Sequence, residues 1–224
     1  MEEIKKRKKQ TSFMKNVLML MVAQVAIKVL GFLYRLVIIN IDGFGDIGNG
    51  YYATGYQIYS LLLTLSSVGI PTVISKLVSE RVAIGDHKGA HRIFTTALKT
   101  FTAIGVIMSF GLFFGADFIA KNIINVEGVK YTLMVLAPAI MFVAAGAVLR
   151  GYFAGLGTMK PTSITQTLEQ FLNCVLTILF VYSTIGQDTA IMAAAGNLSS
   201  TVAIVIAFIY IILFYRKQRK EILE

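Results

Sequence analysis

The sequence predicts an all-α membrane protein, a polytopic bundle of six transmembrane helices, and three observations support this fold class. Hydrophobic residues make up 56% of the 224 residues, and the mean hydropathy is +0.71. Charged residues make up only 15%, whereas a soluble domain carries about a quarter. The basic residues lie mainly between apolar runs, so the net charge of +9 does not indicate a surface for nucleic acid.

Six apolar runs are long enough to cross a bilayer, which requires roughly 20 mostly apolar residues. The runs cover residues 14–41, 51–75, 93–116, 131–149, 164–185 and 191–215. Together they form one six-helix lobe over 13–215, between a basic tail at 1–12 and a short tail or linker at 216–224. The second, fourth and sixth runs contain no charged residue, and of the six runs the second and sixth are the clearest. The first contains Lys28 and Arg35, each of which costs about 2.5–3.5 kcal/mol at the centre of an inserted helix.

Glycine and proline shape several of these runs. A Gly-Ile-Pro triplet at 69–71 lies near the inner end of the second run, where proline is expected to bend or break the helix. The glycine-rich stretch 42–50 is expected to be an ordinary turn between the first two helices. Two glycine pairs have the GxxxG spacing that permits close helix approach, namely Gly111/Gly115 and Gly151/Gly155.

The connecting segments are short, so the excess of Lys and Arg on alternate sides predicts the orientation in the membrane. On one side lie both tails and the loops after the second and fourth runs, which hold Lys5, Lys6, Arg7, Lys8, Lys9, Lys15, Lys76, Arg81, Lys88, Arg92, Arg150, Lys160, Arg216, Lys217, Arg219 and Lys220. The opposite loops hold Lys121, Lys130, Asp42, Asp46, Asp117, Glu127 and Asp188. The pattern predicts a multi-pass protein of the cytoplasmic membrane with both termini in the cytoplasm.

A polar stripe on the first helix is the main candidate binding site. Gln24, Lys28, Gly31 and Arg35 follow one helical face on an otherwise apolar segment. Ionisable groups inside a membrane usually face a water-filled cavity or the bundle interior. A cationic cavity suits an anionic substrate, above all a phosphate or pyrophosphate, which Arg binds in bidentate fashion and Lys as a point charge. Alternatively, Arg35 reaches the outer interface and Lys28 pairs with an internal acid.

The second run carries its own polar face. Gln57 shares this face with three hydroxyl residues, and a tyrosine cluster that includes Tyr56 lies toward the outer end. Hydroxyls and aromatic rings there predict the lining of a sugar-binding cavity. The alternative is ordinary helix packing together with an interfacial tyrosine belt, and the sequence does not decide between the two.

Glu169 is the one acidic residue well inside an apolar run, and Asn173 shares its helical face. Three roles are open for Glu169: a charge partner for Lys28, a coupling site for a proton or cation, or a contact at the inner interface. We expect the structural partner role. His87 and His91 are four residues apart but have no third ligand nearby, so no metal is expected. No motif of an enzyme or of a cofactor site is present.

Four stretches resemble bacterial polysaccharide-type flippases, which include the stage V sporulation protein B and lipid II flippase groups. The stretches are KVLGFLYR at 28–35, YSLLLTLSSVGIPTVISKLVSE at 59–80, GDHKGAHRIF at 85–94 and LRGYFAGLGTMKPTSITQTLEQ at 149–170. This resemblance implies the multidrug/oligosaccharidyl-lipid/polysaccharide (MOP) exporter superfamily. Its members have two six-helix lobes around a central cavity and move lipid-linked sugars by alternating access.

The resemblance also implies partners and site residues. In the lipid II flippases, basic residues of the first helix are implicated in pyrophosphate binding. Lys28 lies where that group has its first arginine, whereas Tyr34 occupies the position of the second and Arg35 follows it. The expected function is therefore a flippase for undecaprenyl-pyrophosphate-linked oligosaccharide or lipid II, acting on membrane lipids and requiring a second six-helix lobe. The alternatives are a multidrug or cation antiporter of the same superfamily and a non-transporting membrane partner protein.

Overall fold

The computed structural model describes residues 18, 21–22, 25–26, 28–67 and 69–223, and these residues form helices joined by short turns. Residues 28–39 are helical and precede the labelled elements. The elements are α2 (Gly45–Ser67), α3 (Ile70–Ala83), α4 (His87–Phe118), the π-helix η1 (Ile119–Ile124), α5 (Val129–Gly155), α6 (Lys160–Ser183) and α7 (Thr189–Leu223). The described part of the chain contains no strand, which confirms the all-α fold class.

The predicted number of six helices is wrong, because the described residues form seven labelled helices after the helical residues 28–39. Two local features account for the difference. Gly69 adopts a φ of 82°, in the left-handed region, and Pro71 follows in the first turn of α3, so the second predicted run forms two helices. This break confirms the prediction for the triplet at 69–71. The end of α4 continues as the separate π-helix η1, which ends at Asn125 with a φ of 57°.

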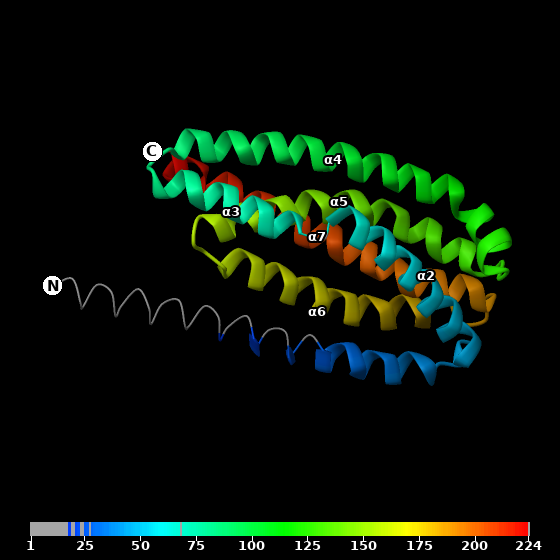
Figure 1. Cartoon of the computed structure of the whole chain (residues 1–224). Helices are drawn as coiled ribbons and strands as arrows, with labels where there is room; N and C mark the ends of the chain where they lie inside the picture. The colour runs from blue at the N-terminus through cyan, green and yellow to red at the C-terminus, as the bar shows by residue number, and fades with distance from the viewer. Residues whose placement is uncertain (1–17, 19–20, 23–24, 27, 68, 224) are drawn as a thin grey trace.

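Four helical stretches of the described chain are long and apolar enough to cross a membrane. They are His87–Ile124, Val129–Gly155, Lys160–Ser183 and Thr189–Arg219. The second predicted run is not among them, because its charge-free helix is divided and the first half of α2 is rich in glycine and polar residues. In Figure 1, α2 and α3 follow one another along the bundle and together extend over the length that α5 covers alone. The first predicted run lies partly outside the described residues.

The helices run up and down along a common direction (Figure 1). The turns α3–α4 and α5–α6 and the C-terminal end of α7 lie at one end of the bundle, and the turns α4–α5 and α6–α7 lie at the other. The first end therefore carries Arg81, Lys88, Arg92, Lys160 and Lys217, and the second carries Asp117, Lys121, Glu127, Lys130 and Asp188. The geometry thus separates the basic turns from the acidic ones, as the topology prediction requires.

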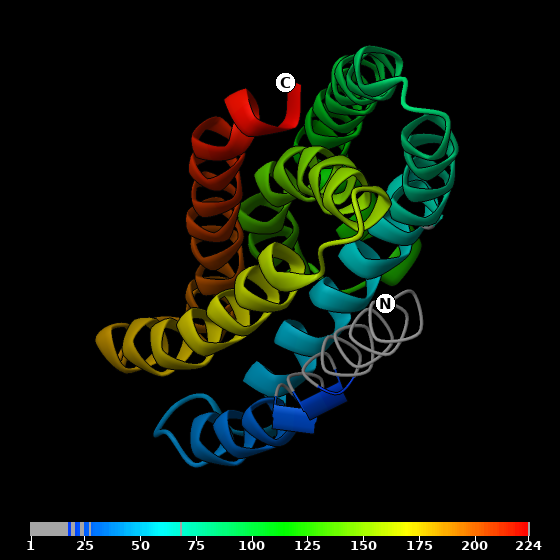
Figure 2. The ribbon, with the colours of Figure 1, turned by 90° about the vertical axis from the view of Figure 1, so that its left-hand side faces the viewer.

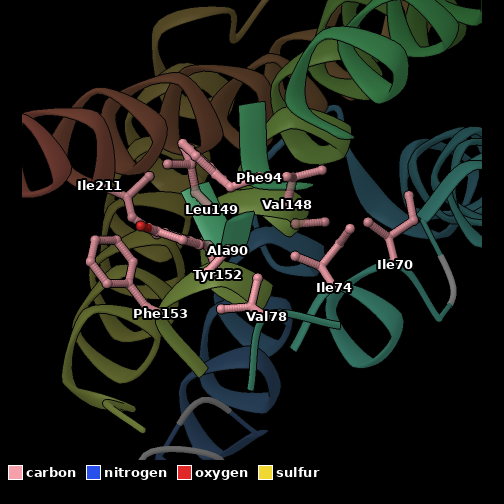
Figure 3. Close-up of a cluster of buried hydrophobic side chains, with 11 residues drawn as sticks. Ile70, Ile74, Val78, Ala90, Phe94, Val148, Leu149, Tyr152, Phe153 and Ile211 are labelled. Carbon is pink, nitrogen blue, oxygen red and sulfur yellow. The ribbon is translucent and has the colours of Figure 1, made fainter. Parts of the chain in front are cut away.

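Helix α5 is the centre of the lobe, in contact with α2, α3, α4, α6 and α7 (Figure 2). Toward the basic end it packs against α3 and α4 in an apolar cluster that includes Ile74, Val78, Phe94 and Tyr152 (Figure 3). Glycine permits this contact: a Cβ on Gly155 would lie 2.7 Å from Val78.

The two GxxxG pairs differ in their surroundings. A Cβ on Gly151 would lie 2.8 Å from the carbonyl oxygen of Pro71, so Gly151 and Gly155 allow the backbones of α5 and α3 to approach closely. A Cβ on Gly111, in the other pair, would have no atom of another described segment within 4 Å. Of the two pairs, the one on α5 therefore serves close packing.

Candidate substrate cavity

A cavity of about 260 Å³ lies among α2, α5, α6 and α7. Its wall combines tyrosines of α2, an arginine of α5, amides and a carboxylate of α6 and a hydroxyl of α7. The polar lining residues are Tyr56, Tyr59, Arg150, Gln166, Glu169, Gln170, Asn173 and Ser200, and the apolar ones are Leu63, Val143 and Ile204. Three residues singled out from the sequence, namely Tyr56, Glu169 and Asn173, thus meet at one cavity.

Arg150 and Glu169 are the charged residues of this wall, and they interact electrostatically across it. Both residues are described, and no ion pair of 4.0 Å or less joins them, so their charges balance across the cavity without direct contact. The opposite charge that acts on Glu169 is that of Arg150 on α5. A charge partnership between Glu169 and Lys28 stays a prediction. A balanced pair is the arrangement expected where charge is withdrawn from water.

Sequence reasoning placed Arg150 in the loop after the fourth run and missed its place in this cavity. The apolar run ends at Leu149, but α5 continues to Gly155 and carries Arg150 into the bundle. The helix ends where Gly157 adopts a φ of 79°, a left-handed conformation that glycine adopts at little cost. This Gly157 is the signal in the sequence that marks the true end of α5.

Asn173 is held in place by hydroxyl groups around its side-chain oxygen. Its Oδ1 accepts hydrogen bonds from Ser199 Oγ at 2.8 Å, Ser200 Oγ at 3.0 Å and Thr177 Oγ1 at 3.1 Å. Ser199 and Ser200 belong to α7, whereas Thr177 lies one turn along α6, so this oxygen joins the two helices beside the cavity. Ser199, Thr177 and Asn173 are all buried.

Tyrosines link the cavity to the first helix. The hydroxyls of Tyr34 and Tyr52 lie 3.1 Å apart, which joins residues 28–39 to α2. The ring of Tyr56 lies 5.8 Å from that of Tyr59 and is still 39% exposed, so it faces both the cavity and the surface. The positive charge of Arg35 acts on the hydroxyls of Tyr52 and Tyr56, and the charge of Glu169 acts on Tyr56 as well.

Lys28 and Arg35 are exposed, and neither makes an ion pair or hydrogen bond with another described residue. Arg35 lies beside the tyrosines, whereas Lys28 lies two turns away along the same helix. Gln57 is exposed and does not line the cavity. Gln24 lies outside the described residues. The described histidines, cysteine and acids form no group of three that could hold a metal ion.

A family profile described as polysaccharide biosynthesis protein matches residues 13–224. The chain belongs to this family. Stage V sporulation protein B of Bacillus subtilis (strain 168) is 33% identical over 215 residues, which cover 96% of this chain and 40% of that protein. The lipid II flippase MurJ of the same organism is 23% identical over 186 residues, 79% of this chain and 34% of that protein.

The fold is shared with solved transporters. An outward-facing multidrug resistance MATE family transporter of the MOP superfamily matches with a TM-score of 0.75 at 18% identity, over 91% of this chain and 45% of that one. The chain therefore spans less than half the length of these relatives. Its apolar helices and its membrane-transporter relatives show that it is a multi-pass membrane protein.

Proposed function

We propose that this chain supplies one lobe of a flippase that moves undecaprenyl-pyrophosphate-linked oligosaccharide or lipid II across the cytoplasmic membrane. The second lobe comes from further sequence of the same protein or from a partner chain. Family membership and a relative named as a lipid II flippase support this proposal. The observation that carries it is the pair of exposed cations, Lys28 and Arg35, without an acidic partner among the described residues.

The charges fit the chemistry of a lipid pyrophosphate. A pyrophosphate diester carries two negative charges, and the two free cations match that number. Lys28 and Arg35 are seven residues apart, which is about 10 Å along a helix, so both can reach one extended anionic group with their long side chains. Arg150 does not add to this excess, because Glu169 balances its charge. Tyr56 and the amides of the cavity then offer hydrogen bonds to the sugar.

The balance of charge between Glu169 and Arg150 argues against an antiporter of organic cations. Such a site requires an acidic group whose charge is free for the drug. Glu169 is the acidic residue of the cavity, and Arg150 faces it. A non-transporting partner protein would need neither the free cations nor the polar cavity.

Growth of a flippase-depleted strain tests this function. The complete transporter that carries Lys28→Ala and Arg35→Ala should fail to restore growth while its level in the membrane stays normal. Lys28→Arg should restore growth, because it keeps the charge. A matched control is Lys217→Ala, which removes an exposed cation near the C-terminal end of α7 that does not line the cavity. Normal growth with both alanines in place would refute the proposal.

The proposed topology places both termini in the cytoplasm. The exposed residues Glu127 and Asp188 then face outward, and His87 and Lys160 face inward. Single cysteines at these positions, in a Cys174→Ser background, should react with a membrane-impermeant maleimide in intact cells only at Glu127 and Asp188. Labelling of His87→Cys in intact cells would overturn the orientation.

A further inference from the structure

A groove lies on the surface of the lobe between α3 and α4, and it shares no lining residue with the cavity described above. This groove has a volume of about 580 Å³ and lies at the end of the bundle that carries the basic turns. It has a charged mouth at Arg81, Asp86 and Arg92, and a wall that leads away from the mouth along α4 toward Phe101. An amphipathic ligand could place its charged group at this mouth and its apolar part along the wall.

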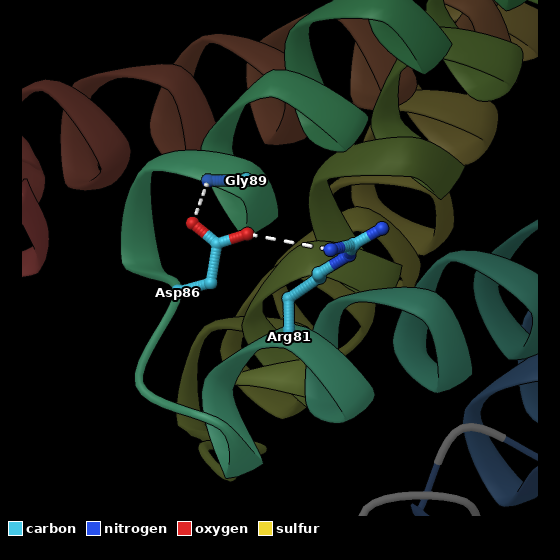
Figure 4. Close-up of polar contacts among 3 residues, drawn as sticks. All are labelled: Arg81, Asp86 and Gly89. Atoms are coloured by element: carbon cyan, nitrogen blue, oxygen red, sulfur yellow. Dashed lines mark hydrogen bonds and ion pairs between the residues drawn. The ribbon is translucent and has the colours of Figure 1, made fainter.

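The mouth has one positive charge in excess. Asp86 caps α4: its Oδ1 accepts a hydrogen bond from the backbone N–H of Gly89 at 2.8 Å, and its Oδ2 lies 3.5 Å from Nη1 of Arg81 (Figure 4). One carboxylate thus serves both the helix terminus and one arginine. The guanidinium of Arg92 is exposed and makes no hydrogen bond or ion pair with a described residue. An ion with one negative charge fits this mouth.

Two hydroxyls lie deeper in the groove. Thr96 and Thr100 line it one and two helical turns below Arg92, at about 5.4 Å per turn. Neither hydroxyl makes a hydrogen bond within the described part of the chain. By contrast, the neighbouring Thr95 donates to the carbonyl oxygens of His91 and Arg92, both at 3.1 Å. The hydroxyls of Thr96 and Thr100 therefore offer donors at the depth where ester groups lie below a phosphate.

The rest of the wall is apolar and open. Leu77 of α3 is 39% exposed, and Ile93 and Phe101 of α4 are partly exposed beside it. Ile93 and Phe101 belong to the span His87–Ile124, which is long and apolar enough to cross a membrane, so hydrocarbon chains are expected beside them. A water-soluble peptide would have to enter the bilayer to reach it.

We propose that this groove binds an anionic diacyl phospholipid with one negative charge, of the phosphatidylglycerol class. Arg81 and Arg92 hold its phosphate, Thr96 and Thr100 donate to its ester oxygens, and an acyl chain lies along Leu77, Ile93 and Phe101. Basic pockets between transmembrane helices on the cytoplasmic side recognise anionic headgroups in this manner. The assignment to the inner leaflet depends on the proposed topology, whereas the binding itself does not depend on topology or on transport.

Native mass spectrometry of the purified chain in detergent tests the site, with phosphatidylglycerol and phosphatidylcholine added at equal concentration. The chain should retain phosphatidylglycerol in preference to phosphatidylcholine. Arg92→Gln should weaken that retention about fivefold, and Arg81→Gln combined with Arg92→Gln about 25-fold. Thr100→Trp should block the acyl path and abolish retention without any change of charge. Arg216→Gln with Lys217→Gln, at exposed positions at the same end of the bundle, is the matched control and should change retention less than about twofold.

The outcomes separate a built site from general attraction. Equal retention of the two lipids would overturn the anionic specificity. An equal loss in the Arg216 and Lys217 control would show only long-range attraction, and unchanged retention in Arg92→Gln and Thr100→Trp would overturn the site. If the double variant unfolds because Asp86 has lost its partner, Arg92→Gln decides alone, since Arg92 makes no hydrogen bond or ion pair with a described residue.

Discussion

Two arginines of this lobe differ in whether an acidic residue balances their charge. Arg150 on α5 points into a cavity where Glu169 balances its charge, whereas Arg35 is exposed and has no acidic partner among the described residues. Ionisable residues inside membranes are functional candidates by default. The comparison refines that rule: a balanced charge serves the packing of the lobe, and an unbalanced one is available to a ligand. Each prediction below alters one side of this comparison.

The largest effect on stability is expected from removal of one member of the balanced pair. Arg150→Met removes the opposite charge that acts on Glu169, which should cost up to about 3–5 kcal/mol of stability, the loss seen when one partner of a buried ion pair is removed. Thermal unfolding in detergent should show a large fall in the midpoint. Arg150→Met combined with Glu169→Leu should recover most of the loss, because neither charge remains. If the double variant is as unstable as the single one, the two charges do not balance each other.

A smaller loss is expected from the contact that places α5 against α3 near Arg150. Gly155→Val puts side-chain atoms into the space of Val78 and should cost about 1–3 kcal/mol through overpacking. The matched control is Gly111→Val, where no atom of another described segment lies within 4 Å of an added Cβ. The midpoints of the two variants should therefore differ clearly in the same assay. Equal midpoints would mean that this close approach does not hold α5.

The hydroxyl shell of Asn173 is expected to contribute next. Asn173→Ala removes the acceptor of Ser200 and the oxygen that joins Ser199 and Thr177, whose hydroxyls keep the backbone carbonyls of Gly196 and residue 173 as acceptors. The loss of stability should be about 1–3 kcal/mol because the buried hydroxyl of Ser200 loses its partner. The control is Asn122→Ala, since Asn122 is exposed and its side chain donates to the carbonyl oxygen of Phe118, one turn away on the same helical stretch. A midpoint for Asn173→Ala equal to that of the control would show that water replaces the lost acceptor.

The smallest change in stability is expected from removal of the exposed cations Arg35 and Lys28. Arg35→Ala and Lys28→Ala remove exposed groups without a partner among the described residues, so each should alter stability by less than about 0.5 kcal/mol. The unfolding midpoint should stay at the wild-type value. A large fall would mean that these cations support the fold.

The sequence predicted the fold class well because hydropathy and loop charge respond directly to the bilayer. It also predicted the break at 69–71, where Gly69 and Pro71 impose local geometry. It did not predict that α2 begins at Gly45, inside the stretch 42–50 that was expected to be a turn, or that its glycine-rich, polar first half keeps α2 from being a clear span. Helix number depends on such local interruptions, which hydropathy alone does not resolve.

The candidate site was predicted in part. Glu169 and Asn173 were selected because they share one helical face, and Tyr56 because it belongs to a tyrosine cluster; all three line the cavity. Arg150 was missed because the apolar run ends one residue before it, while Gly157 sets the end of the helix. The partner of Glu169 could not be predicted, since it depends on the distance between helices rather than on spacing along one. The binding roles of Lys28, Arg35, Gln24 and Gln57 stay predictions.

The most direct test measures binding and stability on the same purified proteins, with lipid II, a pyrophosphate diester, as the probe. Wild type, Arg35→Ala and Arg150→Met should be compared by titration and by thermal unfolding in one detergent. We predict that Arg35→Ala loses at least about tenfold in affinity with an unchanged midpoint, as expected when a charge-assisted hydrogen bond is removed. Arg150→Met should lose stability first. Wild-type affinity in Arg35→Ala, together with full stability in Arg150→Met, would contradict the account.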